Sequence, residues 1–191
     1  MIAVVKVGGS LETDPHRRRA LLASLADGAL GRCIVVPGGG TFAGAVRAAQ
    51  VRDRFSDAEA HRRALDAMSD AAGIFRGIEP RLVQSLDPWS ETAPARARVW
   101  NPRRLRAGHP DIPETWDVTS DSLALWLARE VGAERCVLVK SRDPAPGQDA
   151  AALAQDGLVD AAFPAFAERF AGRIEIWGPA QRVAVAPRVM A

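Results

Sequence analysis

A short apolar run followed at once by glycines occurs twice within the first 40 residues, and this pattern restricts the fold more than any other feature. The first run, residues 3–7, precedes a Gly-Gly-Ser turn, and the second, residues 33–36, precedes Pro-Gly-Gly-Gly. Helical spacing of apolar residues follows each turn, over 14–30 and 42–51. Buried parallel strands that end in glycine turns leave backbone N–H groups free at the carboxyl edge of a sheet, where open α/β folds bind ligands. The pattern therefore predicts an α/β sheet with a ligand site at this edge.

The alternation of strands and helices continues to the end of the chain. A helix over 56–75 begins with the capping box Ser56–Glu59, and two more helices are expected over 122–131 and 163–170. Further apolar runs predict strands at 97–100, 136–139, 174–177 and 183–185. Because neither a linker nor a repeat interrupts this order, we expect a single domain over residues 1–191. Its predicted fold is a three-layer α/β/α sandwich around a mostly parallel sheet.

Two stretches depart from this alternation. Residues 86–116 contain five prolines and three of the five tryptophans, a composition typical of binding loops, and we expect them to form one wall of the substrate site. Residues 145–155 are rich in Ala, Pro, Gly and Gln and are predicted to be mobile.

The composition excludes several classes of protein. A formal net charge of +2 is too small to indicate a nucleic-acid or anionic-membrane partner. No apolar run approaches the roughly 20 residues that span a bilayer, and the start of the chain lacks the basic region of a signal peptide. We therefore expect a cytoplasmic protein. Cys33 and Cys136 lack the spacing of a metal site and are predicted to be reduced core residues.

Lysine is used at two positions only. The chain contains 25 Lys and Arg residues together, yet its only lysines are Lys6 and Lys140, and both close an apolar strand. Lysine is a compact point charge that can follow a moving phosphoryl group, whereas arginine is a planar fork. The pair therefore favours a functional role, although a lysine at a strand end can also simply extend its charge into solvent.

Two aspartates stand at the start of the helix over 122–131. Thr119 or Ser120 can cap this helix, and Asp121 in its first turn can complement the helix dipole. Asp117 lies before the helix, where capping has less need of a carboxylate. Two carboxylates four residues apart can also orient lysines or hold a metal–nucleotide complex, so both interpretations of Asp121 stay open.

These residues are suited to phosphoryl transfer. A Walker A loop is excluded because neither lysine follows a glycine, and the dinucleotide motif GxGxxG is absent. Phosphoryl transfer needs backbone N–H groups that hold phosphates, cations that neutralise the transferring group, and carboxylates that keep the cations in place. Two glycine turns, two lysines and two aspartates supply all three.

Three motifs resemble the amino acid kinase superfamily. They are Lys-x-Gly-Gly-Ser at 6–10, Pro-Gly-Gly-Gly at 37–40 and Asp-x-x-x-Asp at 117–121 before a helix, in the family's order and over nearly the whole chain. The short length and the segment Trp-Asp-Val-Thr-Ser-Asp-Ser at 116–122 are most similar to a small branch that contains aminomethylfuranmethanol phosphate kinase, an enzyme of methanofuran biosynthesis.

The resemblance implies an ATP-dependent kinase with Mg²⁺ carried by the nucleotide, a small phosphorylated acceptor, a homo-oligomer and no metal site on the protein. In this family Lys6 would stabilise the transferring phosphoryl group and Asp121 would order the catalytic lysines. The residues implied to hold phosphates and nucleotide are Gly8, Gly9, Ser10, Gly38, Gly39, Gly40, Asp117, Ser120 and Asp143.

One departure from the family concerns its second catalytic lysine. Larger members carry a late lysine after a glycine and an apolar pair, whereas the matching stretch here, residues 156–160, ends in Asp160. Lys140 is the candidate to replace that lysine, with Arg142 as its rival. The resemblance also assigns residues 143–160 to the adenine, although their composition leaves donor affinity open.

Two classes of function follow. The first is a kinase whose acceptor is a phosphate such as aminomethylfuranmethanol phosphate, or else a carboxylate, carbamate, nucleotide or isoprenoid phosphate. The second is a nucleotide- or metabolite-binding regulatory protein of the same fold with little turnover. Retention of both lysines and both aspartates favours the kinase.

Overall fold

The described residues form one seven-stranded sheet at the centre of the fold. The computed structural model describes residues 2–87 and 97–185, and its strands lie in the order β3-β4-β2-β1-β5-β6-β7. Within these ranges six strands are parallel, and β7 alone runs antiparallel, beside β6. The strands are β1 Ile2–Val7, β2 Arg32–Pro37, β3 Val83–Ser85, β4 Ala97–Trp100, β5 Arg135–Val139, β6 Arg173–Trp177 and β7 Arg182–Val185.

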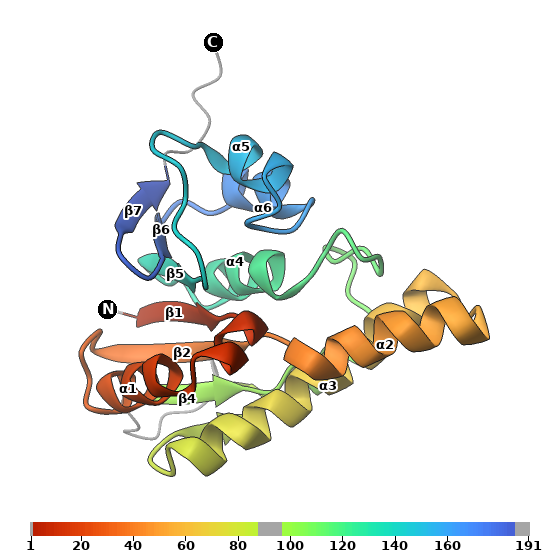
Figure 1. Ribbon diagram of the computed structural model, residues 1–191, viewed down its shortest axis with the longest axis horizontal. Coiled ribbons are helices and arrows are strands. Elements are labelled where there is room, and N and C mark those ends of the chain that lie inside the picture. Colours follow the sequence, from red (N-terminus) through yellow and green to blue (C-terminus); the bar gives the residue numbers. More distant parts are fainter. Residues whose placement is uncertain (1, 88–96, 186–191) are drawn as a thin grey trace.

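Helices cover both faces of the sheet (Figure 1). The α-helices are α1 Pro15–Ala26, α2 Gly40–Asp53, α3 Asp57–Ile78, α4 Ser120–Glu130, α5 Ala150–Gln155 and α6 Phe163–Glu168, and two 3₁₀ helices are η1 Gly9–Thr13 and η2 Pro102–Ala107. One core lies between the sheet and α1 with the end of α3, and the other between the sheet and α4, α6 and the middle of α3. This is the predicted three-layer α/β/α sandwich with a mostly parallel sheet.

Alternation along the central strands decides which residues face which helices. In β1, Val5 and Val7 pack with α1, whereas Val4 packs with α4. In β5, Cys136 and Leu138 likewise face α4. Since successive side chains of a strand point to opposite faces, Lys6 lies on the α4 side, and so does Lys140, one residue beyond β5.

Most predicted elements are confirmed, and the exceptions have local causes. The first helix ends at Ala26 rather than Leu30, because Gly28 and Gly31 adopt positive φ angles that end the helix. The segment 145–155 is not a mobile stretch throughout, since α5 forms within it and buries Leu153. The short edge strand β3 was not expected, because three residues give too little periodicity.

Three further expectations concern the substrate wall, the two cysteines and membrane-spanning helices. Part of the expected substrate wall, residues 88–96 with Trp89, lies outside the described residues. Within the described ranges, Cys33 and Cys136 are buried free thiols, as predicted. None of the helices described is both long and apolar enough to cross a membrane.

Candidate active site

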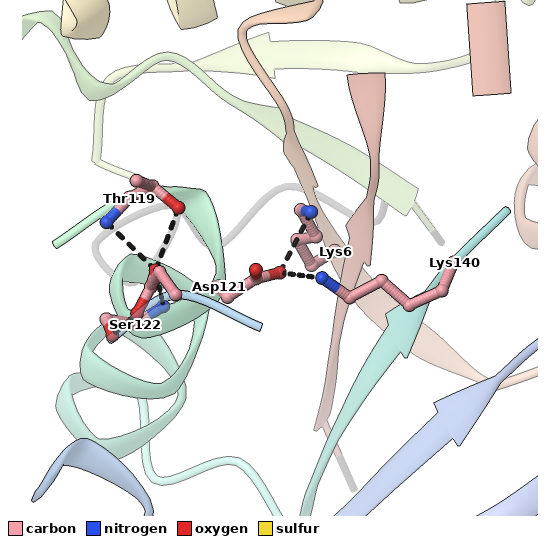
Figure 2. A network of polar contacts seen from close by, with 6 residues as sticks. Lys6, Thr119, Asp121, Ser122 and Lys140 are labelled. Atoms are coloured by element: carbon pink, nitrogen blue, oxygen red, sulfur yellow. Dashed lines mark hydrogen bonds and ion pairs between the residues drawn. The ribbon is translucent and has the colours of Figure 1, made fainter. Parts of the chain in front are cut away.

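A carboxylate shared by the two lysines lies at the carboxyl edge of the sheet. Asp121 Oδ1 is 2.9 Å from Lys6 Nζ and 2.7 Å from Lys140 Nζ (Figure 2). All three side chains are only 7–8% exposed. The two lysines and the second predicted aspartate are therefore brought together, although Asp121 is 115 residues from Lys6 in the sequence (121 − 6).

The strands hold the lysines in register. β1 and β5 are neighbours, and Lys6 is paired with Leu138. Lys140 lies two residues beyond Leu138, so it is on the same face of the sheet and closer to the carboxyl edge. The Lys140 backbone is fixed from two sides, since its N–H donates to Trp177 and its carbonyl accepts from the Arg17 guanidinium at 2.8 Å. Both ammonium groups therefore approach Asp121 from rigid elements.

Burial and like charge make this cluster electrostatically unusual. Burial, followed by the nearby charge of Lys6, lowers the pKa of Lys140 to about 8, against the ion pair with Asp121. Burial opposes ionisation of Asp121 as well, but the charges of Lys6 and Lys140 outweigh it and hold the pKa of Asp121 at about 2. At neutral pH the carboxylate form of Asp121 and the ammonium form of Lys140 therefore both predominate.

The cap of helix α4 comes from a distant residue. Thr119 occupies the N-cap position, but its side chain accepts no bond from the first turn. Instead Asp160 Oδ2 accepts the N–H of Thr119 at 2.9 Å, the Thr119 hydroxyl at 2.8 Å and the N–H of Ser122 at 3.0 Å, and its Oδ1 accepts the Ser122 hydroxyl. Thr119 is thus the N-cap residue, as expected, but the carboxylate that caps the helix belongs to Asp160. No local pattern could indicate a cap 38–41 residues away.

Asp117 does not join the lysine cluster. Its side chain is exposed, its N–H donates to the Thr115 hydroxyl at 3.3 Å, and its carbonyl accepts the N–H of Ala162. Asp121 is thus the predicted aspartate that contacts the lysines. Its contacts favour a role in orienting the lysines over a role limited to complementing the helix dipole.

The two glycine turns pack backbone against backbone. A Cβ on Gly9 would overlap the Cα of Gly40, and one on Gly38 would lie 2.6 Å from the Gly9 nitrogen. Only glycine permits this approach. The N–H groups of Gly8 and Gly38 donate to the carbonyls of Val139 and Val7, so these two amides are engaged in the protein itself.

The start of helix α2 is also engaged. The carboxylate of Glu12, from η1, accepts the N–H of Thr41 at 3.2 Å and lies where a Cβ on Gly40 would be. Gly40 has φ +53°, which a glycine adopts without strain. The sequence does not predict this role of Glu12, because its partner Thr41 lies 29 residues away.

A pocket of about 280 Å³ lies beside the glycine turns, on the side of α3 and the start of α4. Its apolar walls are Leu65, Met68, Val118 and Leu123, and its polar groups include Ser10, Gly9, Gly38, Gly39, Gly40, Arg47, His61, Trp116 and Ser120. Six of the nine residues implied to hold phosphates therefore line one cavity. One of them, Ser120, directly precedes Asp121 in the chain, so the cavity lies next to the lysine cluster.

Arg47 and Trp116 form one wall of this pocket. The Arg47 guanidinium lies 3.8 Å from the centre of the Trp116 ring, and the Trp116 indole N–H donates to Gln50 at 2.6 Å. Trp116 belongs to the stretch expected to line the substrate site. Arg47 was missed, because an arginine on the polar face of a helix carries no local signal.

His61 lies on the α3 side of the pocket. Its Nδ1 is 3.2 Å from the Thr115 carbonyl and is therefore the protonated nitrogen of the neutral ring. Burial lowers the pKa of His61 below its usual range, which favours this neutral form. His61 supplies a polar group to the pocket without adding a charge at neutral pH.

The candidates near the end of β5 have other partners. Arg142 pairs with Asp156 at 2.6 Å and is exposed. The Asp143 carboxylate accepts the N–H groups of Ala180 and Gln181 and so holds the turn between β6 and β7. A role of Asp143 in nucleotide binding stays a prediction. Among the described residues there is no group of three His, Cys, Asp or Glu that could hold a metal ion.

Solved structures identify the class of fold. Uridylate kinase from Archaeoglobus fulgidus has a TM-score of 0.65 at 19% identity, covering 93% of this chain and 90% of its own. UMP kinase from Ureaplasma parvum has a TM-score of 0.65 at 12% identity, covering 96% and 92%. Aspartate kinase from Synechocystis has 0.64 at 14% identity, covering 98% and 41%. The chain has the amino acid kinase fold, and the resemblance expected from its motifs is confirmed.

The sequence itself has a distant curated relative. It is similar to (5-(aminomethyl)furan-3-yl)methyl phosphate kinase from Methanocaldococcus jannaschii, at 23% identity over 142 residues, which is 73% of this chain. The match covers 66% of the relative, so the chain spans about two thirds of that protein's length. No protein-family model matches the sequence. The relative and the solved structures above are all kinases.

Proposed function

We propose that this protein is an ATP-dependent kinase that transfers a phosphoryl group to a small acceptor. The observation that carries the proposal is the contact of Asp121 with both Lys6 and Lys140, at 2.9 and 2.7 Å, beside two glycine turns. Burying two ammonium groups costs free energy, which a purely structural role would not explain. A polyphosphate that enters the site would balance the positive charge that the single carboxylate of Asp121 leaves uncompensated.

Each residue of the cluster has a chemical role in this proposal. MgATP, when bound, supplies the γ-phosphoryl group. Lys6 and Lys140 donate hydrogen bonds to oxygens whose charge grows in the transition state, and buried cations act more strongly there than in water. Asp121 keeps the two like charges close together before substrate binds, so that little reorganisation is needed.

Lys140, rather than Arg142, is the second cation in this proposal. Lys140 shares Asp121 with Lys6, whereas Arg142 is exposed and bonds both the carboxylate and the carbonyl of Asp156. The geometry therefore favours Lys140 as the replacement for the late lysine of larger family members.

The acceptor in this proposal already carries a phosphate. The 280 Å³ pocket combines apolar walls with the glycine turns and one arginine, Arg47, which is suited to a small apolar body with an anionic group. The curated relative phosphorylates a furan phosphate by its name, which makes aminomethylfuranmethanol phosphate the first acceptor to test. A cytoplasmic location and a homo-oligomeric state stay predictions.

The test is acceptor-dependent release of ADP. Purified protein is incubated with MgATP and a panel of small phosphates, carboxylates and nucleotides, and ³¹P NMR follows the products. We expect a diphosphate product with one phosphate acceptor and none with the carboxylates. Binding of MgATP without turnover for any acceptor would instead support the regulatory alternative.

A further inference from the structure

Asp160 connects two parts of the molecule that the sequence separates. It lies in the loop between α5 and α6, and its carboxylate accepts four hydrogen bonds from the first turn of α4. The same loop is bound to the α4 entry by its backbone, since Ala162 donates its N–H to the Asp117 carbonyl. Figure 2 shows Thr119 and Ser122 on one side of this turn and Asp121 projecting from it towards the lysines.

The first turn of α4 therefore has two carboxylates with different tasks. Asp121 points out of the turn to Lys6 and Lys140, and Asp160 holds the turn from outside. Helix starts leave backbone N–H groups without intrahelical partners, and they need an acceptor when buried. Because Ser122 follows Asp121 directly, any movement of the Ser122 N–H away from Asp160 also moves the Asp121 carboxylate.

We propose that Asp160 is a positioning residue that fixes the first turn of α4 so that Asp121 stays between Lys6 and Lys140. Its catalytic consequence depends on the proposed kinase function, but its structural consequence does not. Asp160 stands where the family resemblance places the late lysine of larger members. In this proposal Asp160 acts on Lys6 and Lys140 through α4 and does not touch the substrate.

The charge of Asp160 gives this proposal a second consequence. The charged groups that act on Lys140 are Lys6 on β1, Asp121 on α4 and Asp160 itself, and the negative charge of Asp160 favours the protonated form of Lys140. Removing this charge should therefore lower the pKa of Lys140 further. The positioning role is read separately, from the ammonium signals of both lysines and from kcat.

The experiment exploits the presence of only two lysines in the chain. Protein labelled with ¹³C and ¹⁵N at lysine gives one side-chain signal set for each, and Lys6→Arg identifies which is which. Signals are followed against pH in wild type, Asp160→Asn and Asp160→Ala. Asn can keep one oxygen for the backbone N–H groups while losing the charge, whereas Ala loses both.

Asp149→Asn is the matched control. Asp149 caps α5 in the same way, by accepting the Ala152 N–H at 2.8 Å, but it has no contact with α4 among those described. Because Asn caps a helix about as well as Asp, it should change the melting temperature little and leave both lysine signals unchanged.

We expect the midpoint of Lys140 to fall in Asp160→Asn, because a nearby opposite charge is lost. In Asp160→Ala, the ammonium signals of both lysines should also weaken through exchange with water. With an acceptor in hand, kcat of Asp160→Asn should fall about tenfold or more at constant acceptor KM, since a small misplacement of a catalytic group is costly.

Unchanged lysine signals and an unchanged Lys140 midpoint in both variants would overturn the proposal and leave Asp160 a structural cap. If Asp160→Ala does not fold, the Asn variant decides. A wild-type protein without any phosphoryl transfer would contradict the proposed function instead, while the lysine titrations would still test the position of Asp160.

Discussion

Lys6 and Lys140 carry the same charge, yet both approach one oxygen of Asp121 inside the protein. At such distances two ammonium groups repel each other unless a carboxylate lies between them. Phosphoryl transfer needs this kind of concentrated positive charge at the moment when negative charge spreads over the transferring group. The residue that makes the arrangement possible is Asp121.

Replacing Asp121 by Asn should therefore affect stability as well as activity. The change leaves two buried ammonium groups without a carboxylate, a loss that costs about 3–5 kcal/mol in buried pairs. The loss should be smaller at pH 9 than at pH 7, because Lys140, whose pKa is lowered to about 8, can then release its proton. Urea unfolding at both pH values measures this.

The exposed pair of Arg52 and Asp53 provides the control. Asp53→Asn should leave the unfolding midpoint unchanged at both pH values. If Asp121→Asn were as harmless as Asp53→Asn, the carboxylate would not be what holds the lysine pair.

The pKa of Lys140 also predicts the pH dependence of activity. The ammonium form predominates below pH 8 and is lost as the pH rises through about 8. Since kcat/KM reports the ionisation of the free enzyme, it should be constant between pH 6.5 and 7.5, roughly, and fall above pH 8. In Lys140→Arg the residual activity should show no such fall, because arginine stays charged. A flat wild-type profile up to pH 9.5, roughly, would be incompatible with Lys140 as a catalytic cation.

Among the elements, the two glycine turns and α2 depend on one another. The turn before η1 and the turn before α2 touch at Gly9 and Gly40, and Glu12 bonds the first turn of α2. Helix α2 has no buried residue of its own, and Figure 1 shows it lying beside α3 and beyond the sheet. Its position therefore depends on its packing against α3, on contacts at its ends and on Trp116.

Gly9→Ala should separate the two turns. The added Cβ would overlap the Cα of Gly40, which is backbone and can yield only if a turn shifts. We expect a loss of kcat/KM on the order of a hundredfold, as for other small misplacements in active sites. Steady-state kinetics with the identified acceptor provide the measurement.

Gly44→Ala is the matched control, since a Cβ there would meet nothing within 4 Å. Within helix α2 it should raise stability by up to about 1 kcal/mol, because Ala is the better helix former. Equal activity of Gly9→Ala and wild type would show that the contact between the turns does not matter for catalysis.

The elements also show what a sequence can predict. The sequence could predict that Lys6, Lys140 and Asp121 lie close together. Strand ends and helix starts are local features, and parallel strands bring their carboxyl ends to one edge of the sheet. The roles of Asp160 and Glu12 could not be predicted, because each acts on a helix start 29 or more residues away. Helix starts are chemically alike, so only the tertiary fold decides which distant carboxylate reaches them.

In the whole molecule, the start of α4 lies between the lysine cluster and the pocket, because Asp121 belongs to the first and Ser120 lines the second. β1 and β5 hold the lysines, and the turns after β1 and β2 form the floor of the 280 Å³ pocket. A donor phosphate at the lysines and an acceptor in the pocket would therefore meet across Ser120 and Gly9. The acceptor side of this arrangement can be tested by itself.

Arg47→Ala should raise the acceptor KM about tenfold or more and leave the KM for ATP unchanged, because a hydrogen bond to a charged group contributes about 1.5–3 kcal/mol. Arg47→Lys should recover only part of the loss, since the guanidinium stacks on Trp116 and a lysine cannot form the same fork. Initial-rate kinetics with each substrate varied separate the two KM values. An increase in the KM for ATP alone would place Arg47 on the donor side.

Single-turnover transfer of the γ-phosphoryl group from MgATP to the identified acceptor measures the catalytic role of Lys6 without the later steps of the reaction. It compares wild type with Lys6→Ala and, as a control, Arg142→Lys, each checked by its melting temperature. We predict that Lys6→Ala slows transfer on the order of 10²–10³-fold, the effect of losing one electrostatic stabiliser, while Arg142→Lys keeps most of the rate. Transfer at the wild-type rate in Lys6→Ala would show that Lys6 does not stabilise the transferring phosphoryl group.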